Sequence, residues 1–435
     1  MTTETAPTPQ TSVAQDVPGP ATPRSSRIPL SRIIDNFRDY GLVLALILIM
    51  VFFQLATSGT LFKPVSLSNL VQQNSFIIVM ALGMLLVIVS GHIDLSVGSV
   101  AGFIGALSAT MMVIWPLGFF SNPLVVSIIC LFVGAAIGAA QGYWIAYHRI
   151  PSFIVTLAGM LIFRGLCQAL LGGGASVGPL PDDFKALSSG FIPDVVGTLT
   201  LIPQTLNTAG KPIPNSGLIV HLTTIIIGIL GVVAIAYFGL MNRRTREKHG
   251  HESEPFGIFV TKTAVISLMT LFLVFQFATY KGLPVVLIVM ALLIGLFVFV
   301  TRKTTIGRRV YAMGGNLKAA QLSGIKTDRL TLLVFVNMGV LSALGGLIIA
   351  ARLGQAVPAA GLGSELDVIA AVFIGGASAM GGVGHVAGTV VGGFIMGVMN
   401  QGMSILGVNV DFQQVVKGLV LLGAVVFDVY NKNKG

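Results

Sequence analysis

The sequence predicts an all-α fold, a polytopic membrane bundle of about twelve transmembrane helices, with roughly ten to twelve as the range. Three observations carry this prediction: 54% of the 435 residues are hydrophobic, only 10% are charged, and the mean hydropathy is +0.89. Soluble globular domains do not have this composition. Because a helix satisfies its own backbone hydrogen bonds inside lipid, the long apolar runs are predicted to be helices.

The chain begins with a segment that is not expected to fold. Residues 1–30 are rich in Pro, Thr, Ser and Gln and lack an apolar run, so they cannot bury enough surface to become ordered. They are predicted to form a disordered cytoplasmic tail. A cleavable signal peptide is excluded, because the first apolar run begins only near Leu42, after several Arg residues.

The membrane domain is predicted to extend over residues 41–430. Its spans are expected at 41–57, 70–90, 96–115, 123–147, 151–171, 217–240, 263–280, 283–300, 330–351, 367–380, 387–406 and 413–430. This layout puts both termini and most Lys and Arg residues on the cytoplasmic side. The glycine-rich segment 367–406 fits either a tightly packed hairpin or a re-entrant, broken helix, and simple helix packing is favoured.

Two long loops interrupt the apolar pattern. Residues 172–216 contain Pro, Gly and mixed charges and are predicted to lie outside, where a loop of this length suits the docking of a solute-binding protein. Residues 242–257 are highly charged and predicted to be cytoplasmic, and a solvated linker is the favoured interpretation.

The polar loop at 302–329 is the most ordered of the polar segments. Asn316 is predicted to cap a short helix at 317–322, and Gly324 to end it in the left-handed conformation. The surrounding Lys and Arg residues predict a cytoplasmic position. A helix this short is hardly stable alone, so docking to another protein is one interpretation, and a simple topogenic loop is the other.

Charged residues inside or beside spans are candidates for function. Asp94 precedes a new helix, where either Asp94 or Ser96 can act as a cap, although an acid at a membrane break is also a functional candidate. Arg164 is expected to face the bundle interior and to find a carboxylate or carbonyl partner. Lys417 is expected either to pair with an acid or to extend toward the surface.

Several function classes are excluded or disfavoured. The net charge of +10 arises from loops and not from an aromatic-interleaved patch, so nucleic acid is not expected as a partner. Cys130 and Cys167 lie in apolar runs and indicate no metal site. The histidines are scattered, which disfavours an intramembrane enzyme. No GxxxxGK[ST] motif occurs, so ATP would have to be handled by another subunit.

Three motifs together resemble the membrane subunits of sugar-importing ATP-binding-cassette (ABC) transporters. They are GHIDLSVGS at 91–99, PSFIVTLAGMLIFRGL at 151–166 and GRRVYAMGGNLKAAQLSGI at 307–325, and ELDVIAAVFIGG and VVKGLVLLGAV complete the pattern. The resemblance extends from Asn69 to Val426 and is closest to the xylose and multiple-monosaccharide permeases. Ribose-type members more often have Gly where this chain has His92, which points away from the ribose branch.

The resemblance implies a multi-pass protein of the plasma (inner) membrane that imports a monosaccharide. It implies three protein partners besides lipid: an ATPase with two fused nucleotide-binding modules, an extracytoplasmic sugar-binding protein, and a second copy of this chain. No cofactor is expected, since the partner uses the ATP. The residues implied in contact with the ATPase are Gly307, Arg308, Arg309, Tyr311, Gly314, Gly315, Asn316, Ala319, Ala320, Ser323 and Gly324.

A neutral sugar is matched by amides better than by charges, so polar residues in or near spans are candidates for the substrate pathway. They are Gln72, Gln73, Asn74, Asp94, Asn337, Asn400 and Gln401. Each amide can equally hold two helices together. An ion-coupled secondary transporter of a small polar solute is the alternative function, although only Asp94 suggests the intramembrane acids that such a protein needs.

Overall fold

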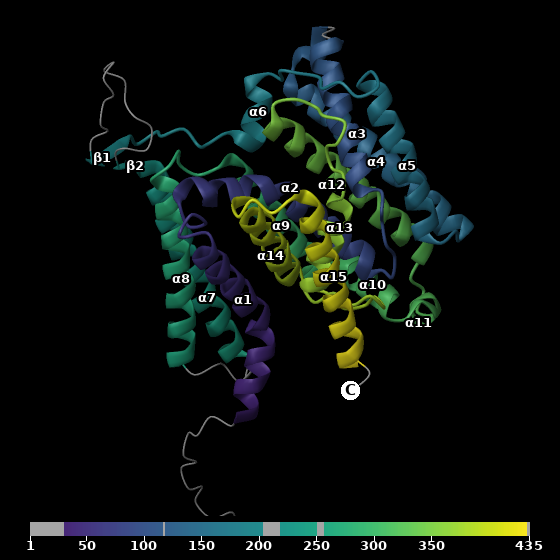
Figure 1. Cartoon of the computed structure of the whole chain (residues 1–435). Helices are drawn as coiled ribbons and strands as arrows, with labels where there is room; N and C mark the ends of the chain where they lie inside the picture. The colour runs from purple at the N-terminus through teal and green to yellow at the C-terminus, as the bar shows by residue number, and fades with distance from the viewer. Residues whose placement is uncertain (1–29, 116–117, 203–217, 250–255, 433–435) are drawn as a thin grey trace, which may run out of the picture. The chain divides into compact units, whose positions relative to one another are not determined.

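A computed structural model of the chain describes residues 30–115, 118–202, 218–249 and 256–432, and Figure 1 shows its trace. The chain divides into two units, Met1–Gly41 and Leu42–Gly435. The tail predicted for residues 1–30 lies outside the described residues except for Leu30, where helix α1 begins.

The described residues are mostly helical, as the composition predicts. The long helices are α1 (Leu30–Ala56), α2 (Pro64–Val89), α4 (Pro123–His148), α5 (Ser152–Leu170), α7 (Leu222–Lys248), α8 (Phe256–Ala278), α9 (Val285–Lys303), α12 (Thr327–Leu353), α14 (Val386–Ile405) and α15 (Val410–Lys432). The shorter ones are α3 (Val97–Ala109), followed by a π-helical turn at Thr110–Ile114, a 3₁₀ turn at Gly118–Ser121, α6 (Asp182–Ser189), α10 (Thr305–Gly315), α11 (Leu317–Leu322) and α13 (Ser364–Ile374).

Within the described part of the chain, nine helices are long and apolar enough to cross a membrane. They are α2, α3 with its π-helical turn, α4, α5, α7, α8, α9, α12 and α14. The span predicted at 367–380 differs from the prediction, because its helix, α13, ends at Ile374. Eleven residues give a helix of about 16 Å, roughly half of the hydrocarbon thickness. The structure therefore has a short helix where a full span was favoured.

The helices pack as two groups with the same contacts. The first group is α2 to α5, and the second is α12 to α15, taken in the same order. Helix α2 contacts α12, α13 and α14, and its counterpart α12 contacts α2, α3 and α4. Likewise, α3 contacts α4 and α5, and its counterpart α13 contacts α14 and α15. Helices α2 and α12 are antiparallel, because Gly83 lies beside Met338 while Gly345 lies beside Met80. The second group is thus an inverted counterpart of the first, an arrangement that many transporters share.

Each group contains an interrupted crossing. Residues 90–96 lead into α3 without helical structure, and residues 354–363 lead into α13 in a similar way. The starts of these two short helices meet inside the bundle, where Gly98 lies against Ser364 and the carbonyl oxygen of Gly361. Arg164 on α5 lies near this junction, in a small pocket that Gly102 and Ala360 also line.

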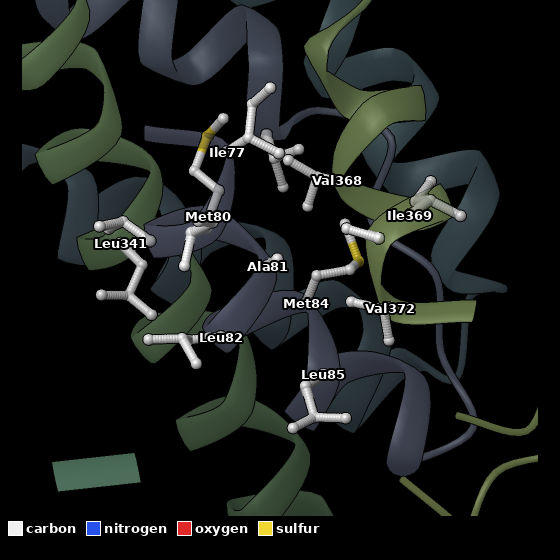
Figure 2. Close-up of a cluster of buried hydrophobic side chains, with 14 of the residues drawn as sticks. Ile77, Met80, Ala81, Leu82, Met84, Leu85, Leu341, Val368, Ile369 and Val372 are labelled. Atoms are coloured by element: carbon white, nitrogen blue, oxygen red, sulfur yellow. The ribbon is translucent and has the colours of Figure 1, made fainter. Parts of the chain in front are cut away.

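The apolar core lies around α2, whose side chains are buried along almost its whole length. Figure 2 shows Met80, Ala81 and Met84 of α2 between Leu341 of α12 and Val368 of α13. A cluster of this size, closed on several sides by apolar helices, fixes α2 as the central helix of the unit. The short helix α13 is therefore held by core packing and not by its own length.

The two long loops are more ordered than predicted. The loop predicted at 172–216 contains α6 and strand β1 (Thr198–Ile202), which pairs antiparallel with β2 (Leu218–His221), while residues 203–217 lie outside the described residues. Helix α6 packs against α12, and Leu180 donates its N–H to the carbonyl oxygen of Gly354. In the insert predicted at 242–257, α7 continues to Lys248, and residues 244–249 are exposed to solvent, as a solvated linker would be. Its residues 250–255 are outside the described part.

Candidate functional site

The polar loop 302–329 folds into two consecutive helices, α10 and α11. Helix α10 was not predicted, although its sequence contains the signal: the Thr304 hydroxyl accepts a hydrogen bond from the N–H of Gly307 at 3.2 Å and caps the helix. Gly307, Val310 and Met313 are its buried residues, at a spacing of three. One face of α10 thus packs on the bundle, and the opposite face carries exposed Arg308 and Arg309.

Helix α11 confirms the predicted cap and stop. The Asn316 Oδ1 accepts the N–H of Ala319 at 2.9 Å, and Gly324 has φ +78° in the left-handed region. Ala320 is buried, whereas Leu317 and Leu322 are 54% and 86% exposed. Two exposed leucines beside Lys318 form the kind of mixed apolar and basic surface that protein interfaces use.

The C-terminal end of α10 is anchored by close backbone contacts. A Cβ atom built on Gly314 would collide with the carbonyl oxygen of Val89 at the end of α2. The same oxygen accepts the N–H of Gly382 at 2.8 Å, and Gly382 has φ +76°, which favours glycine. The Tyr311 hydroxyl donates to the carbonyl oxygen of Gly384 at 2.7 Å. Helix α10 is therefore joined both to α2 and to the segment between α13 and α14.

The chemistry of Tyr311 fits this anchoring role. Burial raises the pKa of the Tyr311 phenol, against a smaller effect of the Arg302 charge. The hydroxyl group therefore stays protonated and remains a donor.

The predicted contact residues consequently fall into two sets with different surroundings. The exposed set, available to a partner, is Arg308, Arg309, Gly315, Asn316, Ala319, Ser323 and Gly324. The packed set, buried or half-buried against the bundle, is Gly307, Tyr311, Gly314 and Ala320. The sequence motif alone did not separate them, because both sets alternate along the same two short helices.

A cavity of about 600 Å³ lies beside α11. Residues from separate segments line it, among them His92, Arg149, Ser152, Gln321 and Asp328. The loop 302–329 thus meets residues 91–93 and the connection between α4 and α5 at one end of the bundle. Figure 1 shows α10 and α11 at this end, below α12.

The residues predicted for the substrate pathway are not brought together as one site. Gln73 is exposed, whereas Gln72 is buried and its Nε2 has no hydrogen-bond partner among the residues that the structure describes. Asn74 donates to the carbonyl oxygen of Leu70 at 2.7 Å, and Gln401 donates to that of Ser66 at 3.3 Å. The Asn74 amide thus bonds within its own helix, and the Gln401 amide joins α14 to α2. Both bonds fit a structural role for these amides. Asn337 is half-buried on α12, with its Nδ2 unpartnered in the described residues.

Asp94 belongs to a buried network. Its Oδ1 accepts both the N–H of Ser96 at 2.8 Å and the hydroxyl of Ser96 at 2.7 Å. The Gln141 Nε2 on α4 donates to the same hydroxyl at 3.0 Å. The predicted side-chain cap is wrong in detail: Ser96 stands at the N-cap of α3, but neither side chain makes a capping bond to the helix. Asp94 instead fixes the turn that leads into α3.

Asn400 is a pathway candidate that lies beside two charged residues. Its Nδ2 donates to the Oδ2 of Asp367 at 3.2 Å, and the Lys417 Nζ lies 2.9 Å from the same oxygen. Asp367, Asn400 and Lys417 come from α13, α14 and α15 and are here called the polar triad. Of the two alternatives predicted for Lys417, pairing with an acid and extension toward the surface, the structure shows the pairing.

The comparisons with known proteins are consistent with these elements. The family described as "Branched-chain amino acid transport system / permease component" matches residues 66–193 and 208–425. The chain is 39% identical over 400 residues to the xylose transport system permease protein XylH of Haemophilus influenzae, covering 92% of this chain and 98% of that protein. No solved structure matches the chain.

Two further relatives have similar descriptions. XylH of Escherichia coli K12 is 37% identical over 401 residues, covering 92% of this chain and 93% of that protein. The ribose import permease protein RbsC of Escherichia coli K12 is 32% identical over 371 residues, covering 85% and 88%.

Proposed function

The chain belongs to the family of branched-chain amino acid transport system permease components, and from this membership we propose that it carries xylose or a related monosaccharide as the membrane subunit of an ABC importer. The observation that carries the proposal is the similarity to XylH over nearly the full length of both chains. As a permease component with nine helices able to cross a membrane among the described residues, the chain is a multi-pass membrane protein that is not itself catalytic.

The proposed topology has twelve crossings with both termini in the cytoplasm. Two crossings are each made of a non-helical segment followed by a short helix, at 90–109 and 354–374. Non-helical backbone is tolerated at membrane depth where it is buried in protein. The basic loop 302–329 then lies inside the cell, and labelling of a cysteine placed at Asn316 in intact cells would overturn this topology.

The exposed face of α10 and α11 is the proposed docking surface for an ATPase subunit. Its residues are basic and apolar, and its anchor through Gly314 and Tyr311 passes any movement on to α13 and α14. Replacing exposed Gly315 or Asn316 with Trp is expected to lower sugar-stimulated ATP hydrolysis by about tenfold or more, because bulky groups at the centre of an interface block it.

The matched control is Gly257→Trp, since Gly257 also has open space at its Cβ and lies in an exposed helical turn far along the chain. Membrane insertion should be unaffected in all three variants. Normal hydrolysis and uptake by Gly315→Trp would exclude the docking role.

Three protein partners are proposed from the family. They are an ATPase with two fused nucleotide-binding modules, an extracytoplasmic sugar-binding protein docking on the loop 172–216, and a second copy of this chain. The ordered contacts of α6 with α12 support a loop built to receive a partner. Affinity purification in mild detergent should recover the ATPase. We expect one ATPase chain, with its two fused nucleotide-binding modules, for every two permease chains.

An ion-coupled secondary transporter is the second candidate, because one observation favours it. The inverted helix groups with interrupted crossings, together with the buried pair of Asp367 and Lys417, resemble the architecture of ion-coupled carriers. Uptake into proteoliposomes separates the two functions. The importer requires ATP and the ATPase subunit, whereas the carrier requires only a proton or sodium gradient.

A further inference from the structure

The polar triad joins three helices that are far apart in sequence. Lys417 of α15 and Asn400 of α14 both donate to one oxygen of Asp367 on α13. Asp367 is only 6% exposed, whereas the Lys417 side chain is 24% exposed. The triad is thus buried on the α13 side and partly open on the α15 side.

The hydrogen bonding of the triad is incomplete. The other oxygen of Asp367, Oδ1, and the Oδ1 of Asn400 are both buried and accept no hydrogen bond from the described residues. Buried acceptors without donors are uncommon in proteins and cost free energy. Lys417 has three N–H donors, and one of them is used on Asp367. The cluster therefore has two unused acceptors and unused donors beside each other.

We propose that the polar triad is a subsite for two neighbouring hydroxyl groups of the transported sugar, an inference that rests on the proposed function. Each hydroxyl donates one hydrogen and accepts others, so one can donate to Asp367 Oδ1, the second to Asn400 Oδ1, and both can accept from Lys417. Because Lys417 already compensates the Asp367 charge, a neutral polyol suits the site better than a cation does.

Two features of the surroundings suit transient binding of a sugar during transport better than tight, permanent binding. Helix α15 is held mainly through α13 and α14, and its Val415 and Leu419 are exposed, so this cover has few contacts of its own. The segment that follows α13 is hydrogen-bonded to two other helices. Its Gly384 accepts from Tyr311 of α10, and its Gly382 donates to Val89 of α2. Movement of the loop 302–329 therefore reaches Asp367 through the short helix α13.

The test compares D-xylose with a set of monodeoxy xyloses in proteoliposomes that hold the complete transporter, with the binding protein saturated by each sugar. Asn400→Leu is expected to slow D-xylose uptake about tenfold, the size of one hydrogen bond. At least one deoxy analogue, the one that lacks the hydroxyl contacting Asn400, should be transported equally by the variant and the unsubstituted protein. This analogue-specific pattern is a readout that a structural role does not change.

The matched control is Gln401→Leu, an amide change at the next residue of α14, whose side chain bonds to Ser66. It is expected to change the uptake of every sugar by the same factor. If Asn400→Leu also slowed all sugars equally, the triad would be a structural element and the proposal would be overturned. Absence of ATP-dependent D-xylose uptake by the unsubstituted protein would overturn the proposed function itself, and the subsite with it.

Discussion

The two inverted helix groups contain corresponding polar clusters that are completed in different ways. In the first group Ser96 bonds to both Asp94 and Gln141, and none of their atoms is among the buried unpartnered atoms of the described residues. In the second group Asp367, Asn400 and Lys417 leave two acceptors unpartnered. A closed network fixes one arrangement of its helices, whereas an open one retains binding capacity. The same helix packing thus supports a rigid half and a half that is suited to a ligand.

The largest expected effect comes from removing the cation of the open cluster. Lys417→Met leaves the buried Asp367 carboxylate uncompensated and should lower the free energy of unfolding by about 3–5 kcal/mol. Chemical unfolding in mixed micelles measures this value. The double variant Asp367→Asn with Lys417→Met should recover most of the loss, and equal losses in both proteins would show that charge burial is not the cause.

The next largest effect is expected at Gly314, where the C-terminal end of α10 contacts the backbone of α2. Gly314→Val places side-chain atoms against the Val89 carbonyl and should cost about 1–3 kcal/mol, as overpacked sites do. Gly315→Val is the neighbouring control, because its Cβ meets no atom within 4 Å. Unfolding of the two variants in the same micelles makes the comparison. Equal stabilities would mean that α10 is not held by this contact.

A smaller effect is expected in the closed cluster. Gln141→Leu removes the neutral hydrogen bonding between the Gln141 amide and the Ser96 hydroxyl and should lower stability by about 1 kcal/mol. The ratio of D-xylose uptake to deoxy-xylose uptake should stay unchanged, in contrast to Asn400→Leu. A shift in this ratio for Gln141→Leu would contradict the division into a rigid and a binding half.

The smallest effect is expected for an acid paired outside the spans. Asp194 lies 2.6 Å from the Nδ1 of His221 and accepts the N–H of Thr223 at 3.0 Å. Although burial acts to raise its pKa, the bonds from Thr223 and His221 hold the pKa of Asp194 below its ordinary value. Asp194→Asn should cost less than about 1 kcal/mol, because such pairs are screened by water.

This pair also has a defined pH dependence. A lowered carboxyl pKa in the folded protein means that the stabilisation is present above the ordinary pKa of aspartate. It is lost as the pH falls through the lowered value, since both states are then protonated. Unfolding measured from neutral to strongly acidic pH should show this loss in the unsubstituted protein and not in Asp194→Asn. An identical pH dependence in the two proteins would count against the pairing.

Local features of the site were accessible from the sequence because they depend on nearby residues. The Asn316 cap bonds to a residue three positions away, and Gly324 needs only its own backbone conformation. Helix α10 escaped prediction although its Thr304 cap is equally local, because the polar run was interpreted as a loop around one short helix. A search for a second capping residue would have found it.

Long-range features were not accessible in the same way. The contact of Lys417 with Asp367 joins residues 50 positions apart, and both were visible only as isolated charges in apolar runs. Asn400 was one amide among several, and nothing in the sequence distinguished it from Gln401, which bonds to a distant backbone. The length of α13 also depended on packing, since glycine-rich sequence permits both a hairpin and a break.

The amino-acid sequence by itself determined that this chain is a mostly helical membrane protein with a capped basic loop, because hydropathy and capping act within one or two helical turns. Only the tertiary structure decided which polar groups meet, which glycines carry close backbone contacts, and that α13 is a short helix beside the polar triad. The physical reason is that partner choice across helices depends on how whole apolar faces pack, and that information is spread over the entire chain.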